Sequence, residues 1–107
     1  MWFAASLLFK WVDRLQPRRE LRWEDRIVLI KAQSEAEAHA IADILGQKAA
    51  RDYAECDDDG VTVIFEAVES VWELEGETLE SGTELFSRFL RPHAARSLLQ
   101  ASGNPVA

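Results

Sequence analysis

Apolar and polar residues alternate in several stretches of the chain, and such alternation predicts β-strands. The longest alternating stretch covers residues 61–74, in which Val61, Val63 and Phe65 share one face. The alternation changes phase near Glu69, which predicts a β-bulge. We expect this stretch to be the central strand, around which the rest of the chain is arranged.

Residues 2–12 form a second alternating stretch, and both of its faces are largely apolar. We expect a core face of Phe3, Ala5, Leu7, Phe9 and Trp11, and a weaker face of Trp2, Ala4, Ser6, Leu8 and Lys10. A strand at the edge of a sheet leaves backbone amides and carbonyls unpaired, and neither a proline nor several charges protect this stretch. If it lies at an edge, it invites pairing with a second copy.

Two further stretches complete the predicted sheet. Residues 23–32 contain the run Ile27–Ile30, which is apolar on both faces, as is typical of an interior strand covered on both sides. Residues 83–90 follow a glycine-flanked turn, and we expect them to pair as the closing strand.

The chain also carries two helix signals. Ser34 and Glu37 match a capping box, which predicts a helix that runs to about Tyr53. Gly46 inside this helix is unfavourable by about 1 kcal/mol relative to alanine and indicates a close approach to the sheet. We expect its apolar stripe to consist of Ala40, Ile41, Ile44, Leu45 and Lys48. Pro92 fits the first turn of a short helix that ends near residue 101.

These elements predict a single α+β domain over residues 1–101, followed by a flexible tail at 102–107. We expect a mainly antiparallel sheet of four to five strands, with the long helix packed on one face and a short C-terminal helix. The chain of 107 residues is long enough for one modest core.

Composition and charge indicate the cellular compartment and the kind of binding partner. No apolar run is long enough to cross a bilayer, and a lone cysteine fits a reducing compartment, so we expect a cytoplasmic protein without a membrane partner. The net charge of −7 is uneven, because twelve acidic residues and no Lys or Arg lie between Asp52 and Ser87. Such a face repels nucleic acid and favours a basic protein partner.

The candidate metal and nucleophile motifs are weak. Glu55, Asp57, Asp59, Gly60 and Glu66 match the spacing of an EF-hand loop, but the following residues read as a strand rather than a helix. Cys56 stands beside three aspartates, which raise the pKa of a thiol and suppress the thiolate. Together with His39 and His93 it makes no zinc motif. We therefore expect no metal site, no cofactor and no catalytic residue.

Tryptophan and glutamate supply the candidate interaction residues. The chain has four tryptophans, more than its core needs, and tryptophan is enriched at the centre of protein interfaces. The glutamates of residues 66–75 form the polar face of the predicted central strand, where they are also candidates for acid–base or metal chemistry. We expect interaction through Trp2, Leu8, Trp11, Trp72, Glu66, Glu69 and Glu73.

Three segments resemble a small family of bacterial proteins, the domain of unknown function 4288 family. They are residues 1–9 (MWFAASLLF), 23–38 (WEDRIVLIKAQSEAEA) and 82–91 (GTELFSRFLR). The resemblance implies a compact single-domain bacterial protein with no established activity, and it brings no functional residues.

Two functions from different classes follow. The first is a non-enzymatic protein-interaction module that self-associates as a homodimer, such as an immunity- or antitoxin-like binder of a basic partner. The alternative is a small divalent-metal-dependent hydrolase that uses the carboxylates of residues 66–75. Two or more of these carboxylates around one concave pocket would favour the enzyme, and a flat acidic face would favour the binder.

Overall fold

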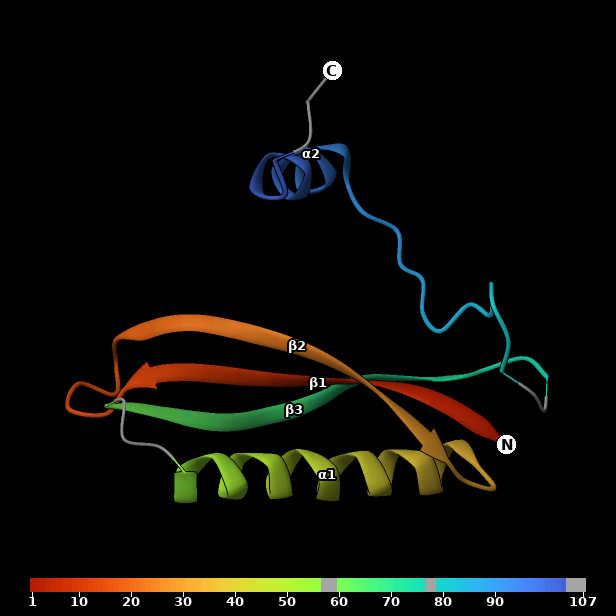
Figure 1. Ribbon diagram of the computed structural model, residues 1–107, viewed down its shortest axis with the longest axis horizontal. Coiled ribbons are helices and arrows are strands. Elements are labelled where there is room, and N and C mark those ends of the chain that lie inside the picture. The colour runs from red at the N-terminus through yellow and green to blue at the C-terminus, as the bar shows by residue number, and fades with distance from the viewer. Residues whose placement is uncertain (57–59, 77–78, 104–107) are drawn as a thin grey trace.

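The computed structural model describes residues 1–56, 60–76 and 79–103, and of Cys56 only the backbone. Its elements follow in the order β1 (Trp2–Asp13), β2 (Glu20–Lys31), α1 (Glu35–Cys56), β3 (Val61–Glu73) and α2 (Pro92–Ala101). The strands form a sheet, α1 lies along one face of it, and α2 stands away from both (Figure 1). The α+β class is as predicted, but the details of the sheet are not.

The sheet in the described part of the chain has three antiparallel strands in the order β2-β1-β3, rather than four to five. The predicted closing strand is missing, because residues 83–91 form an extended segment that pairs with no strand. The centre of the sheet is β1, and β3, predicted to be central, is an edge strand. Local alternation identifies strands, but their order depends on pairing between β1 and β3, which lie far apart in sequence.

Strand β3 contains two irregularities rather than one. Its pairing with β1 skips Glu69 and then Glu66, so that each is an extra residue without an opposite partner. The phase change predicted near Glu69 is confirmed, and the second bulge restores the alternation. As a result Val68 and Val71 both lie on the side of α1, among the residues that pack against the core.

The core lies between the sheet and α1. The predicted core face of β1 is confirmed. It meets small residues of the helix, and the buried cluster consists of Phe3, Ala5, Leu7, Phe9, Ile30, Ala32, Ala38 and Ala42. The predicted stripe of α1 is only partly right, since Ile41 packs against the core but Ile44 is 64% exposed. Alanine and Gly46 take the facing positions, because small side chains let the helix approach the sheet closely.

The ends of the helices follow their local sequence. The backbone amide of Glu37 donates a hydrogen bond to Ser34 Oγ at 3.1 Å, which caps α1 as predicted. The second helix begins at Pro92. Proline has no backbone amide, and an amide in the first turn of a helix would have no partner within the helix. Neither helix of the described residues is long and apolar enough to cross a membrane.

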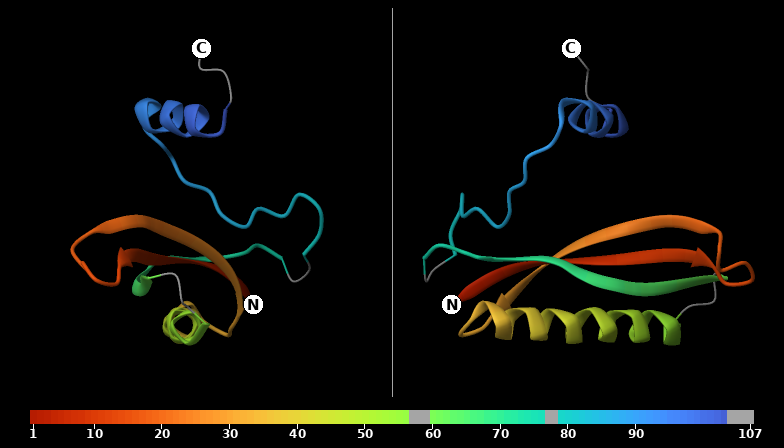
Figure 2. Two further views of the ribbon diagram at one scale, coloured as in Figure 1. Left: turned by 60° about the vertical axis from the view of Figure 1, so that its left-hand side comes forward. Right: turned by 180° about the vertical axis from the view of Figure 1, so that it is seen from behind.

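The chain between the sheet and α2 is a strap, which we define as residues 83–91. It leaves the end of β3, runs over the sheet on the side opposite α1, and then leads away to α2 (Figure 2). No contact joins α2 to any strand or to α1. The sheet therefore has one face covered by a helix and one face, called the open face below, that carries only the strap.

Candidate interaction site

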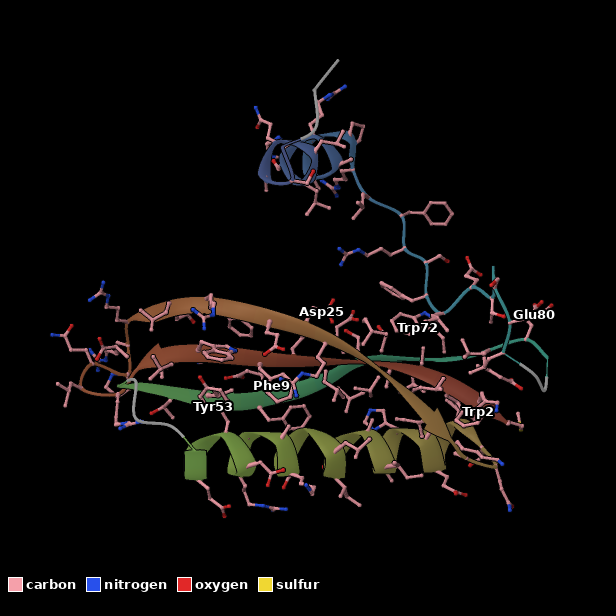
Figure 3. All side chains as sticks on the ribbon, in the orientation of Figure 1. Trp2, Phe9, Asp25, Tyr53, Trp72 and Glu80 are labelled. Atoms are coloured by element: carbon pink, nitrogen blue, oxygen red, sulfur yellow. The ribbon has the colours of Figure 1, made fainter. Side chains whose placement is uncertain are left out.

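Four carboxylates surround one hollow at the end of β3. This acidic hollow has a volume of about 410 Å³ and is lined by Glu73, Glu75, Gly76, Glu80, Thr83 and Glu84. It lies near the start of β1, and Figure 3 shows Glu80 at the same end of the molecule as Trp2.

Local structure places the members of the hollow. Buried Leu74 donates its backbone amide to the carbonyl of Trp2 at 2.8 Å and so fixes the chain between Glu73 and Glu75. A tight turn then joins Glu80 to Thr83. The amide of Thr83 donates to the carbonyl of Glu80, and the amide of Glu80 donates to Thr83 Oγ1, both at 3.0 Å.

The conformation of this turn requires a glycine. Gly82 has φ of 95°, a left-handed conformation that residues with a side chain rarely adopt. The turn therefore holds Glu80 and Glu84 on the same hollow as the two glutamates at the end of β3.

The carboxylates of the hollow lack the ion pairs that some other acidic groups make. Glu66 pairs with Lys10 at 3.1 Å, and Asp52 pairs with Lys48 at 2.7 Å. Within residues 1–56, 60–76 and 79–103, no ion pair engages any of the four glutamates around the hollow. The hollow thus concentrates negative charge at an exposed surface, and such a field attracts a cationic group from solution.

The carboxylates do not form a metal centre in the described part of the chain, where no three His, Cys, Asp or Glu side chains come together around one ion position. Two of the predicted carboxylates, Glu73 and Glu75, do line the same concave hollow. The condition that would favour the enzyme, two carboxylates of this series on one concave pocket, is therefore met, although the described residues do not form a ligand set for a divalent ion.

The open face is the second candidate surface. Its apolar members come from all three strands, and the exposed ones are Trp23, Ile27, Leu29 and Ile64. Trp23 is 50% exposed, and Lys10 lies over its ring at 5.7 Å from the centroid. The run Ile27–Ile30 is thus apolar on both faces as predicted, but the expectation that both are covered is wrong, because β2 is an edge strand and α1 covers only one face.

The strap is held on the open face at two points. The ring of Phe86 packs against Trp72 with centroids 4.3 Å apart. Farther along, Arg88 Nη1 lies 3.9 Å from Asp25 Oδ2, and Asp25 also accepts a hydrogen bond from the hydroxyl of buried Ser6. These contacts attach the first part of the strap to the sheet and leave the part beyond Arg88 exposed.

The predicted interaction residues divide into three groups. Trp2, Leu8 and Trp72 share the open face, and Glu73 lines the acidic hollow. Glu66 and Glu69 are the two bulge residues of β3. Glu66 pairs with Lys10 of the open face, and Glu69 lines a hollow of that face together with Leu8 and Trp72.

Trp11 has a structural role on the side of α1. Its ring packs against Tyr53 at 4.7 Å, and its Nε1 donates to Glu24 at 3.1 Å. Trp11 is therefore not part of either candidate surface.

Sequence reasoning missed four residues that define the two surfaces. The position of Trp23 and Asp25 on the open face is set by the pairing of β2 with β1. Trp23 lies opposite Lys10 and Asp25 lies opposite Leu8, so each shares the face of its partner. Glu80 and Glu84 depend on the fold of the loop after β3, for which the sequence gives only the turn signal of Gly82.

The remaining predictions on chemistry and pairing have mixed outcomes. The condition under which residues 2–12 would invite pairing with a second copy is not met, since β1 pairs on both sides. His39 on α1 and His93 on α2 are not brought together, because these helices make no contact. The side chain of Cys56 and the aspartates at 57–59 lie outside the described residues, so the structure does not bear on the EF-hand spacing.

Comparison with known proteins identifies the family. The chain matches the profile of a domain of unknown function, DUF4288, over residues 2–87. It belongs to the DUF4288 family. The match covers the sheet, α1, the acidic hollow and the first half of the strap, and it ends before Arg88 and α2. No curated protein and no solved structure matches the chain.

Proposed function

We propose that this DUF4288 protein is a non-enzymatic interaction module that binds a basic protein partner at the acidic hollow. The observation that carries the proposal is the convergence of Glu73, Glu75, Glu80 and Glu84 on one hollow without a cation from the described part of the chain. A lysine or arginine side chain of a partner supplies the missing positive charge, and complementary charge of this kind speeds association and selects the partner. An immunity- or antitoxin-like protein that neutralises a basic target would use such a surface.

The fold supports a recognition role for this end of the molecule. The hollow is built at the end of a sheet strand and on a hydrogen-bonded turn, so the backbone that carries its glutamates is ordered before a partner arrives. A surface that is already ordered loses less conformational entropy on binding.

The test is a titration of the isotope-labelled protein with a short Lys/Arg peptide, followed by amide chemical shifts at low salt. We expect the shifts to concentrate at residues 73–84 and to diminish as salt is added, because salt screens exposed charges. A double variant, Glu80→Gln with Glu84→Gln, should weaken peptide binding several-fold.

A matched control separates the hollow from net charge. Glu20→Gln with Glu55→Gln removes the same two charges from exposed positions at the start of β2 and the end of α1, which lie at the opposite end of the sheet from the hollow (Figure 1). Equal weakening by the two double variants, or shifts spread over the whole acidic surface, would show that the peptide senses only the net charge and would contradict the proposal.

One observation favours the alternative function. Glu73 and Glu75, from the predicted carboxylate series, share a concave hollow, as a small divalent-metal-dependent hydrolase would require. Calorimetric titration with Mg²⁺ and Mn²⁺ distinguishes the two functions. Stoichiometric binding that Glu73→Gln abolishes, together with metal-dependent cleavage of an ester or phosphodiester substrate, would establish the hydrolase in place of the interaction module.

A further inference from the structure

The open face and α2 each lack an apolar partner in the described structure. The open face exposes Trp23, Ile27 and Leu29 of β2 and Ile64 of β3, which lie on one side of the sheet. On α2, Leu98 is 51% and Leu99 is 40% exposed, and the helix has no buried residue. Contiguous exposed apolar surface marks an interaction site in soluble proteins.

A free helix of this length is not stable by itself. Isolated helices shorter than about 12–15 residues are marginal in water, and most helices in proteins depend on packing of an apolar face. α2 has only 10 residues, and its alanines and leucines recur at the spacing of one face: Ala94, Ala95, Leu98, Leu99 and Ala101. The helix therefore depends on packing of its apolar face against another surface.

The C-terminal segment is basic, whereas the rest of the chain is acidic. Residues 85–107 carry three arginines and no acidic residue. Because the whole chain has a net charge of −7, the other residues have a net charge of −10. One arginine of the strap, Arg88, already lies beside Asp25 on the open face. Arg91 and Arg96 extend the same charge along the strap and α2.

The direction of the strap favours a second molecule over the same one. Beyond Arg88 the strap leads away from the sheet, and Phe89 is fully exposed (Figures 1 and 2). Arg91 is held extended, with φ of −67° and ψ of 148°, as expected for the residue before a proline. A return of α2 to its own sheet would need a reversal within residues 89–91.

The radius of gyration of a single chain also indicates that the C-terminal part extends away from the sheet. The radius of gyration of the Cα atoms is 16.5 Å. A compact domain of this length is expected to have about 13 Å, from the usual scaling with chain length. The excess indicates a chain whose C-terminal part is not packed against its own domain.

We infer that two copies of the chain form a two-fold dimer in which α2 of each copy lies on the open face of the other. The leucines of α2 cover Ile27, Leu29 and Trp23 of the partner, and the arginines approach its acidic groups. Exchange of an identical element between two copies is an economical route to a symmetric dimer. This dimer uses a different surface from the acidic hollow, which stays exposed at the end of each sheet.

The experiment is sedimentation equilibrium of the full chain at micromolar concentrations. We expect a mass of twice 12.1 kDa for the parent protein. Leu98→Asp, Leu99→Asp and Ile27→Asp should each give the mass of a single chain. These residues are exposed in one chain, so the sheet and α1 should stay folded in the variants. The circular dichroism should therefore lose at most the contribution of α2, which no longer has a surface to pack on.

Gln100→Asp is the matched control, because it adds the same charge to the polar side of α2 and should leave the dimer intact. A monomeric parent would overturn the inference. So would a dimer that persists in the Leu98→Asp and Leu99→Asp variants, because α2 would then not be part of the interface. A dimer that persists in Ile27→Asp would equally show that the open face is not the docking surface.

Discussion

Gly46→Ala tests how closely α1 approaches the sheet. A Cβ atom at position 46 would lie 2.3–2.6 Å from three ring atoms of Phe65, well inside van der Waals contact. The ring also packs against Phe9 with centroids 5.4 Å apart, so a movement of the ring would disturb this aromatic contact. An alanine at this site must therefore displace the ring or push the helix away from β3.

The two effects of this substitution have opposite signs. Alanine in the middle of a helix is favoured over glycine by about 1 kcal/mol. Overfilling a packed core is unfavourable by about 1–3 kcal/mol, and loss of the aromatic contact adds about 0.5–1.5 kcal/mol. We expect the steric effect to dominate, so that Gly46→Ala lowers the free energy of unfolding by about 1–2 kcal/mol.

Urea unfolding followed by tryptophan fluorescence measures this difference. All variants should be compared at one protein concentration, because self-association makes apparent stability depend on concentration. In a thermal melt, the expected loss corresponds to a decrease of Tm of about 4–8 °C for each kcal/mol in a domain of this size.

Two controls isolate the steric effect. Ala40→Gly at an exposed position of α1 reports the helix propensity alone and should lower stability by about 1 kcal/mol. In a Phe65→Leu background the smaller side chain leaves room, so Gly46→Ala should lose most of its effect. If Gly46→Ala stabilises the parent protein, the close contact with Phe65 does not exist in solution.

Two further predictions concern the cap of α1 and the anchoring of the strap. Ser34→Ala removes the N-cap hydrogen bond and should lower the free energy of unfolding by about 1 kcal/mol, whereas Gln33→Ala, next to it, should have little effect; equal stabilities would contradict the cap. Phe86→Ala removes the ring that holds the strap on β3 and should speed trypsin cleavage after Arg88, the strap arginine that no proline follows. Phe89→Ala should not change the cleavage rate, because Phe89 is already fully exposed, and similar rates for both variants would show that Phe86 is not an anchor.

Much of the local structure could be predicted from the sequence. The core face of β1, the cap at Ser34, the bulge near Glu69 and the start of α2 at Pro92 all depend on neighbours within a few residues. The close approach of Gly46 to the sheet was also predictable, because glycine is unfavourable inside a helix unless space requires it.

The order of the strands could not be predicted in the same way. Residues 83–90 have the residue types of a strand, but they form no ladder with another strand and instead lie on the open face through the side chains of Phe86 and Arg88. Which strand is central depends on the pairing of β1 with β3, and local periodicity does not encode this pairing.

The candidate site was predictable only in part. Glu73 could be singled out from the acidic run, but Glu80 and Glu84 reach the same hollow through a turn whose geometry the sequence does not specify. The apolar character of both faces of Ile27–Ile30 was correctly recognised. That only one face is covered within a single chain emerged from the structure.

The most direct test of the exchanged dimer is a distance measurement between two different copies. One sample of the protein carries Gln100→Cys with a spin label, together with Cys56→Ala, and contains no isotope label. It is mixed with isotope-labelled parent protein that carries no spin label. We predict broadening of the amide signals of residues 23–29 in the isotope-labelled chains, because α2 of one copy would lie on the open face of the other. Unchanged signals at 23–29 in the mixture, with broadening only when both labels are in one chain, would contradict the exchange and place α2 on its own sheet.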